Sequence, residues 1–322
     1  MKKLKKLICS MLSALLIMNL STTVLADGDS LSRIAEYTIQ VNEDVDITGS
    51  LTTTFTNLDT FIDTVRENYP KIADYDIARF LMQYTQQDCE GLPEDVVLSI
   101  LEYDNITVST SYVRIDADGN SYALNDNCLP IDDYTSNDGY IKFTTTYSNT
   151  KTVGKQKYYN VFGSATWLKY PAMRLRDCFV VGTNGTFDDS VSEKGNVIQS
   201  FKCIRCGAIT YKTRTVTKSK RVDNDLNLKY DSGVPELHFD ALSTQKCSSC
   251  DGFTEDYSFT LFISYGVIAS EAKNIQASYG HQTVGFKNDI SVSISGDGTA
   301  SLSASVGTKI ETYTARPVTM KY

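Results

Sequence analysis

Four cysteines in the second half of the chain occur as two closely spaced pairs. Cys203 and Cys206 stand in the stretch FKCIRCGAIT, and Cys247 and Cys250 stand in QKCSSCDGF. Two cysteines three positions apart can direct both sulfurs toward one point, because the turn between them also aims backbone N–H groups at the thiolates. A glycine within two residues of each pair permits the tight turn that this arrangement needs. Together the four sulfurs could fill the tetrahedral shell of a zinc ion.

The two pairs and the segment between them resemble a zinc ribbon, in which turns at two strand ends hold one metal ion. The segment between Cys206 and Cys247 is longer than in a compact ribbon, but strand-like runs at 208–218 and 234–242 could return the chain. The resemblance covers residues 203–252 and names no family. It implies a structural zinc ion with no ligand position left open for a substrate. The implied ligands are Cys203, Cys206, Cys247 and Cys250.

The beginning of the chain predicts export, which favours a different fate for these cysteines. Residues 1–26 combine four lysines, an apolar run from Leu7 to Leu20, and small residues before a cleavage point after Ala26, as secretory signals do. We therefore expect a secreted protein whose signal peptide is removed. Thiols of exported proteins usually oxidise to disulfides.

Disulfides therefore remain the alternative to a zinc site. They could form within each pair or between the two pairs, as Cys203–Cys250 and Cys206–Cys247. A disulfide within a CxxC closes a very small loop and restrains little of the unfolded chain, so the spacing favours the metal. A redox-active CxxC would need a βαβ context, which the sequence lacks. Seven cysteines remain after export, an odd number that leaves at least one thiol unpaired. Those outside the two pairs are Cys89, Cys128 and Cys178.

The charge of the chain limits its partners. The formal net charge is −8, and loss of the four lysines of residues 1–26, which contain no acid, brings it to −12. An acidic surface repels phosphate groups, so we expect no general binding to nucleic acid or to anionic membranes. The strand-like stretch YKTRTVTKSK is basic instead, and one of its faces could bind a cell-surface or other anionic polymer, with a solvated strand face as the alternative. The basic residues of that face are Lys212, Arg214, Lys218 and Lys220.

Apolar periodicity divides the mature chain into a helical region and a β-rich region. Residues 27–104 hold a strand-like run at 36–41 and three helical stripes, one after the capping residue Asn57, one at 77–84 and one in LPEDVVLSILEY. In residues 105–322 apolar residues alternate with polar ones, and turn signals separate the strands. We expect an α+β protein, predominantly β. A small N-terminal region of three short helices precedes an antiparallel β-sandwich-like region with the zinc-ribbon-like insert embedded in it.

The alternating segment 284–310 predicts a long hairpin. Its even positions are apolar and its odd positions are mostly Ser or Thr, so even residues must pair with even residues across the turn. A three-residue loop at 296–298 meets this condition, because it pairs Ile294 with Ala300 and places Gly298 at the left-handed position. Arms of about eleven residues also match the length of a bilayer-spanning strand. Pore formation is therefore an alternative to an ordinary outer hairpin of a sandwich.

No spacing in the sequence brings a catalytic set together. The two histidines, His238 and His281, lie in separate strand-like runs, and neither belongs to a metal-binding pair of histidines. His238 shares a strand face with Asp240 and could join a polar site. Cys178 with a distant histidine is the minimum of a thiol protease, but it lacks any local signature, so we interpret it as a buried strand cysteine.

These observations predict a secreted, non-enzymatic, extracellular binding or structural protein with a structural zinc site. A secreted pore-forming or antimicrobial protein that uses the 284–310 hairpin is the first alternative. A secreted hydrolase with an unrecognised site is the second.

Overall fold

The structure, a computed structural model, describes residues 25–45, 50–115, 121–124, 139–169, 176–217, 226–271, 273–284, 290–305 and 308–320. Within them the chain forms four α-helices, a short 3-10 helix and eighteen strands, and every strand pair is antiparallel. This confirms the α+β, predominantly β class expected from the sequence. The helices are α2 (Leu25–Thr38), α3 (Leu58–Asn68), α4 (Asp74–Tyr84), α5 (Glu94–Leu98) and the 3-10 helix η2 (Ser99–Glu102).

The larger of the sheets has ten strands. Eight follow the order β1-β2-β3-β5-β6-β13-β9-β10, while β4 pairs with β3 and β8 pairs with β13. Its long central strands are rich in Thr, Val, Tyr and Phe, which fit a pleated surface that is covered on both faces. The strands are β1 (Gln40–Val45), β2 (Leu51–Thr56), β3 (Ile106–Ile115), β4 (Ser121–Leu124), β5 (Gly139–Val153), β6 (Gln156–Lys169), β8 (Thr186–Asp188), β9 (Lys194–Cys203), β10 (Ile209–Thr217) and β13 (Thr254–Ala269).

The second sheet has six strands in the order β11-β12-β7-β14-β17, with β18 beside β14. A third sheet consists of β15 and β16 alone. The strands are β7 (Arg176–Thr183), β11 (Leu226–Lys229), β12 (Glu236–Asp240), β14 (Lys273–Val284), β15 (Ile290–Ile294), β16 (Ala300–Ala304), β17 (Lys309–Thr314) and β18 (Val318–Met320).

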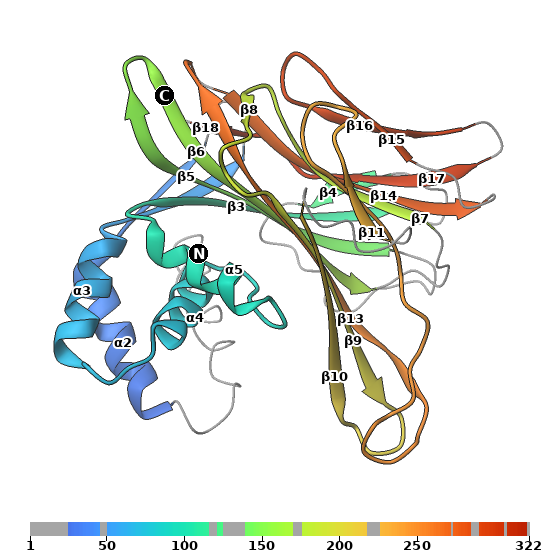
Figure 1. The fold of residues 1–322 in the computed structure, drawn as a ribbon, viewed down its shortest axis with the longest axis horizontal. Helices are drawn as coiled ribbons and strands as arrows, with labels where there is room; N and C mark the ends of the chain where they lie inside the picture. The colour runs from blue at the N-terminus through green and yellow to red at the C-terminus, as the bar shows by residue number, and fades with distance from the viewer. Residues whose placement is uncertain are drawn as a thin grey trace, which may run out of the picture.

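The sheets and helices stack in layers (Figure 1), with one apolar core on each side of the ten-stranded sheet. On one side the helices cover it, and Phe162 and Phe262 of the sheet join the helical core. On the other side the six-stranded sheet covers it, and Trp167 packs edge-on against Tyr279 and Tyr313 in the core between the sheets. The alternation predicted from the sequence therefore places successive side chains of one strand in two different cores.

The N-terminal region contains more than the three short helices expected. Helices α3, α4 and α5 lie where apolar stripes predicted them, but α2 occupies 25–38, where the sequence suggested polar chain and a strand. The strand follows as β1, and β1 and β2 add to β3 at one edge of the large sheet. Asn57 stands before α3 in a left-handed conformation with φ of 64° and makes no side-chain capping bond, so the expected cap is wrong. No helix among the described residues is long and apolar enough to cross a membrane.

The final hairpin has the predicted register but not the predicted length. Ile294 pairs with Ala300 and Val292 with Leu302, and Gly298 adopts a φ of 88°. The three-residue loop is confirmed, since Ser295 N–H donates to the Thr299 carbonyl at 3.0 Å. Each arm, however, has five paired residues. The ends of the 284–310 segment belong elsewhere, because Val284 closes β14 and β17 begins at Lys309, while 285–289 and 306–307 lie outside the described residues.

The ends of β9, β10 and β13 extend beyond the two-sheet body as a finger (Figure 1). We use this name for residues 200–212 and 245–258, which include the turn that joins β9 to β10 and the turn that leads into β13. In the finger Cys203, the last residue of β9, pairs with Thr254 of β13, and Lys202 pairs with Ile209 of β10. The finger lacks a second sheet behind it, so its strand ends require another source of stability.

Candidate metal centre

The first cysteine pair forms a tight turn between β9 and β10. Cys203 N–H donates to the Ala208 carbonyl and Gly207 N–H donates to the Cys203 carbonyl, both at 2.9 Å. The N–H of Cys206 points at the Cys203 sulfur from 3.5 Å. Gly207 has a φ of 72°, a left-handed conformation that glycine adopts without steric cost.

The second pair repeats this turn before β13. Cys247 N–H donates to the Gly252 carbonyl at 2.8 Å, and Asp251 N–H donates to the Cys247 carbonyl at 3.1 Å. Asp251 takes the place of the glycine, with a φ of 51°, which Asp tolerates better than most residues. Gly252 is required for a different reason, because a Cβ there would lie 3.0 Å from the sulfur of Cys203.

The two turns face each other and bring the four predicted sulfurs together. All four Sγ atoms lie within 4.8 Å of one another. The shortest distances are 3.4 Å between Cys203 and Cys250 and 3.6 Å between Cys206 and Cys247. A tetrahedral zinc ion with four Zn–S bonds of about 2.3 Å would separate its sulfurs by about 3.8 Å. A disulfide requires about 2.05 Å. The four sulfurs are thus spaced as metal ligands, and the cluster could hold a metal ion.

The charges of the thiols follow from their surroundings. The backbone N–H of Cys206, helped by that of Arg205, lowers the pKa of the Cys203 thiol to about 6. The pKa of Cys250 rises to about 12, because the neighbouring thiols outweigh a backbone N–H from Gly252 that lowers it. Four sulfurs this close cannot all be anionic without a cation among them. The full set of thiolates therefore calls for a metal.

The cluster is partly enclosed. Cys203 and Cys247 are buried, Cys250 is intermediate and Cys206 is exposed. A set of four sulfurs fills a tetrahedral shell, which is the composition of structural rather than catalytic sites.

The two other cysteines that the structure describes, Cys89 and Cys178, lie outside the cluster. Cys89 is buried in the helical core, where burial raises the pKa of its thiol. Cys178 is buried in the core between the sheets. Cys128 falls outside the described residues.

Cys178 and His238, which the sequence left far apart, stand opposite each other on β7 and β12. The Cys178 sulfur lies 3.6 Å from Nε2 of His238, and a carboxylate oxygen of Glu236 lies 3.1 Å from the same Nε2. A catalytic triad uses one ring nitrogen for the nucleophile and the other for the orienting carboxylate. Here both neighbours share Nε2, and Nδ1 has no hydrogen-bond partner among the described residues.

The environment of Cys178 also opposes nucleophilic chemistry. All three side chains are buried, and burial, with the nearby charge of Glu236, raises the pKa of the Cys178 thiol well above its usual value. A thiol of that kind is inert. The interpretation of Cys178 as a buried strand cysteine is confirmed. His238 joins a polar group, as the sequence allowed, and the carboxylate beside its ring is that of Glu236.

A second buried polar group, around His281, was not predicted from the sequence. His281 Nδ1 lies 2.7 Å from a carboxylate oxygen of Asp177, and the hydroxyl of Tyr279 donates to the other oxygen at 2.6 Å. Burial lowers the pKa of His281, but Asp177 and Glu311 outweigh burial and raise it overall. His281 and Asp177 are cross-strand neighbours on β14 and β7. Only knowledge of that strand pairing would have revealed the group.

The structure describes two of the four residues of the predicted basic face. Lys212 is exposed, but Arg214 is half-buried and donates from a guanidinium nitrogen to the Asp240 carbonyl at 2.6 Å. Lys218 and Lys220 lie outside the described residues.

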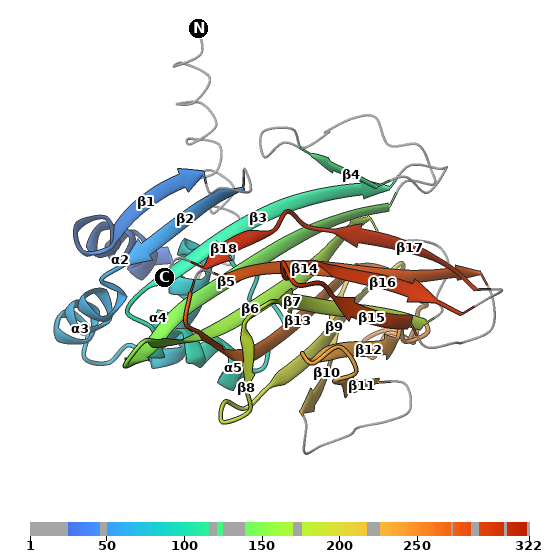
Figure 2. The ribbon, with the colours of Figure 1, turned by 90° about the horizontal axis from the view of Figure 1, so that it is seen from above.

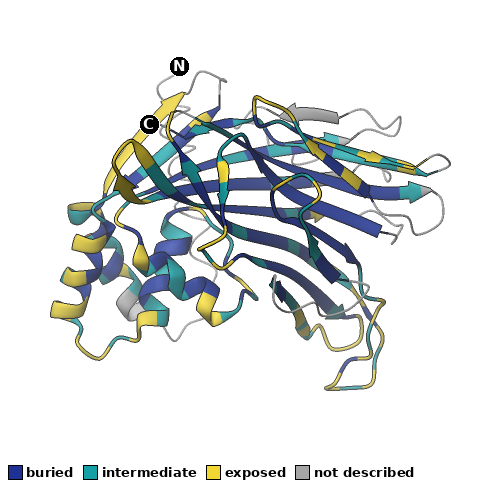
Figure 3. Cartoon of the chain, turned by 45° about the horizontal axis from the view of Figure 1, so that its top comes forward, coloured by how far each residue is buried: buried dark blue, intermediate teal, exposed yellow. Residues whose placement is uncertain are grey.

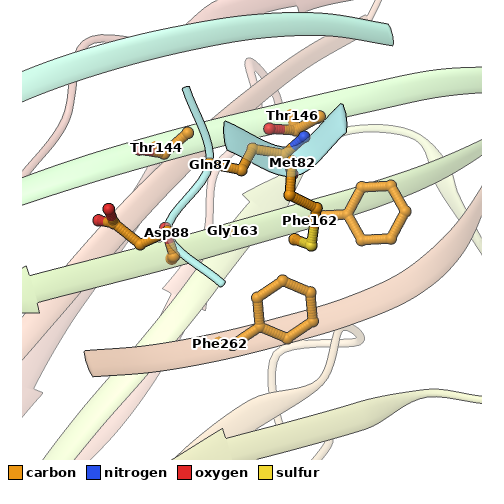
Figure 4. A pocket seen from close by; sticks show the side chains of 9 residues that line it. Met82, Gln87, Asp88, Thr144, Thr146, Phe162, Gly163 and Phe262 are labelled. Carbon is orange, nitrogen blue, oxygen red and sulfur yellow. The ribbon is translucent and has the colours of Figure 1, made fainter. Parts of the chain in front are cut away.

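The hollows of the described structure are small. One cavity between the end of α4 and the large sheet, shown in Figure 4, has a volume of about 10 Å³. That is room for about one water molecule, far below the roughly 300 Å³ or more of a small-molecule site. Asp88 at its rim is engaged by Lys142 Nζ at 3.1 Å and by the Thr166 hydroxyl at 3.2 Å. We therefore take the four-cysteine cluster as the candidate functional site.

Comparisons with known proteins do not assign the chain to a family. No protein-family model matches it, and no curated protein matches it. Among solved structures, a similar one is the crystal structure of the Clostridium perfringens NetB toxin in the membrane-inserted form. The identity is 8%, the match covers 65% of this chain and 89% of that chain, and the TM-score is 0.17. A likeness at this level carries no argument about fold or function.

Proposed function

We propose that this chain is a secreted, non-enzymatic binding protein whose finger is held in shape by a structural zinc ion. The observation that carries the proposal is the meeting of two matching turns with four sulfurs within 4.8 Å. A soft set of four thiolates in tetrahedral arrangement suits zinc, a metal without redox chemistry. Cys203, Cys206, Cys247 and Cys250 would each supply one thiolate.

Binding is the activity that this arrangement supports. A closed set of ligands stabilises the surrounding chain and offers no position for a substrate. The chain it would stabilise is the finger, which projects from the body (Figure 1) and includes exposed residues such as Ile204 and Phe253. Export is supported by the residue pattern of 1–26, of which 1–24 lie outside the described residues.

Native and denaturing mass spectrometry of the purified mature protein test this proposal. We expect one zinc ion per chain, lost on denaturation, with four thiols then open to alkylation at the cluster. Cys206→Ser should abolish zinc binding, and Cys89→Ala, which removes a thiol outside the cluster, should leave it intact. A metal-free protein that carries the crossed disulfides Cys203–Cys250 and Cys206–Cys247 would contradict the proposal, because these are the sulfur pairs that lie closest.

A second candidate function, pore formation, is favoured by the way the final hairpin is attached. Strands β15 and β16 form their own sheet and make no backbone ladder with the six-stranded sheet. They lie across β7 and β14 (Figure 2), where Gly182 and Gly280 leave space for Ile294 and Leu302. Side-chain bonds, such as that of the Ser278 hydroxyl to the Ala300 carbonyl at 3.3 Å, fasten them.

Five paired residues per arm are fewer than the nine to eleven of a bilayer-spanning strand. Pore formation would therefore require neighbouring residues to join each arm. Dye release from liposomes tests it with a matched pair of variants. Leu302→Arg, on the apolar side, should stop release, whereas Ser301→Arg, on the polar side, should not. Absence of release by the unmodified protein at neutral and acidic pH would end this candidate.

A further inference from the structure

The tip of the finger exposes large apolar side chains. Ile204 is 68% exposed, Phe253 76%, Tyr257 55% and Ile209 41%. Figure 3 shows this end of the molecule largely as exposed surface. Scattered exposed apolar residues are ordinary, but several at one projecting end indicate a contact surface. We call these four residues, with Lys202 and Arg205, the tip surface.

The backbone beneath the tip surface holds these side chains outward. Ile204 lies between the two cysteines of the first turn, and its N–H donates to the Phe253 carbonyl at 3.1 Å. Phe253 directly follows the second turn and bridges to Lys246. Both large side chains thus come from backbone that the two turns fix, so they cannot fold inward while the cysteine cluster is intact.

The finger is slightly basic, whereas the whole protein is acidic. Within 200–212 and 245–258 the basic residues number four and the acidic residues three, in a chain of net charge −8; they are Lys202, Arg205, Lys212 and Lys246 against Asp251, Glu255 and Asp256. Lys202 Nζ lies 5.4 Å from the ring centre of Tyr257, and an Arg205 guanidinium nitrogen lies 3.5 Å from the Cys250 carbonyl. Asp251 of the second turn and Glu255 of β13 are exposed, and Glu255 pairs with Lys202 across the strands. From outside the finger, Glu90 accepts a hydrogen bond from the Tyr211 hydroxyl at 2.7 Å.

We propose that the tip surface docks into the interface of an anionic lipid bilayer. Ile204 and Phe253 would enter the region between headgroups and acyl chains, while Tyr257 lies at headgroup level and Lys202 and Arg205 meet lipid phosphates. Apolar side chains flanked by basic ones are the composition that binds such interfaces. This inference rests on the proposed function, since the zinc-held turns give the tip surface its shape, and it names the partner.

The shape of the tip favours a bilayer over a protein partner. A bilayer interface accepts apolar side chains from a convex projection without a matching cavity. A second copy of this chain would need to offer a hollow for Ile204 and Phe253, and two hollows of the described structure beside α4 measure only about 10 Å³ each. The acidic remainder of the protein would also orient the molecule, because it is repelled by the anionic surface that the finger meets.

Co-sedimentation of the zinc-loaded mature protein with vesicles tests the docking. Vesicles of phosphatidylcholine with phosphatidylserine should bind the protein, and those of phosphatidylcholine alone should bind it more weakly. The double variant Ile204→Ser, Phe253→Ser should lose at least about tenfold in affinity. Lys202→Gln with Arg205→Gln should lose most of the preference for anionic vesicles and its salt dependence. The matched control Val153→Ser, Leu168→Ser removes exposed apolar residues outside the finger and should bind normally.

Zinc content, measured on the same samples, separates failure of this inference from failure of the proposed function. A protein with one zinc ion per chain that does not bind anionic vesicles overturns the docking and leaves the zinc-held finger standing. A protein without zinc overturns the proposed function. Dimers that dissociate in the Ile204→Ser, Phe253→Ser variant would assign the tip surface to a second copy and also overturn the docking. Phe253→Trp adds a direct readout, because its emission should shift to the blue on vesicles, whereas that of Leu168→Trp should not.

Discussion

The finger and the six-stranded sheet each hold a cluster of polar side chains, and the two clusters are built in opposite ways. The four cysteines of the finger come from two short turns, and their sulfurs lie near the surface. The Asp177, His281 and Tyr279 cluster is assembled from neighbouring strands distant in sequence, and it is buried. The finger cluster could hold a metal ion near the surface, whereas the buried cluster lies inside the core between the sheets.

This difference also separates what the sequence could predict from what it could not. The turns that hold Cys203 and Cys247 are local, so the spacing of the cysteines and the glycines after them indicated the geometry. The pairing of His281 with Asp177, or of Cys178 with His238, depends on which strands become neighbours. Strand order is decided by packing over the whole sheet, and no local spacing encodes it.

The largest expected effect is loss of metal from the finger. Cys206→Ser should lower zinc affinity by more than about 100-fold, because even outer-shell partners of a metal are worth 10–100-fold. Without the ion the strand ends of β9, β10 and β13 lose the group that joins them. Limited proteolysis should then cut between residues 203 and 252 while the rest of the chain stays resistant. If the finger resists proteolysis equally before and after chelation, its turns need no metal. The finger cluster, like the buried one, would then be stable without an ion.

A change in the buried cluster should lower the stability of the fold and leave zinc binding unchanged. Asp177→Asn removes the carboxylate that pairs with the buried ring of His281, and breaking a buried pair typically costs about 3–5 kcal/mol. Denaturant unfolding should show a loss of about 3 kcal/mol or more in the free energy of unfolding. Zinc affinity should remain unchanged, because the cluster lies outside the finger. Ser293→Ala, at an exposed position of β15, is the control and should unfold as the unmodified protein does.

The effect of pH on stability should come from the buried cluster. Asp177 and Glu311 raise the pKa of His281 in the folded protein above the ordinary histidine value of 6.5. The folded state therefore binds the proton more tightly than the unfolded chain does. The stabilisation is fully present below pH 6.5 and is lost as pH rises through the folded pKa. Unfolding measured between pH 5 and 9 should show this decline, and His281→Gln should flatten it. An unchanged slope in that variant would place the titration elsewhere.

Local sequence patterns predicted only part of the N-terminal region and of the final hairpin. The stripes of α3, α4 and α5 were visible, because a helix shows its buried face at a regular spacing. α2 was not expected, since few apolar residues mark its buried side, chiefly Leu31 and Ala35. The register of β15 and β16 followed from alternation and a left-handed glycine. Their length did not, because β14 and β17 pair with each other and take the ends of the segment.

The smallest effect compares the two turns of the finger with each other. Gly207 and Asp251 occupy equivalent left-handed positions, but only the first is free of a side chain. Gly207→Ala should destabilise its turn by about 1 kcal/mol, and Asp251→Gly should stabilise the other by a similar or smaller amount. Because the turns shape the metal site, zinc affinity measured by competition with a chelator should fall in the first variant and rise in the second. If zinc affinity fell in both variants, the side chain of Asp251 would stabilise its turn by more than the left-handed backbone conformation destabilises it.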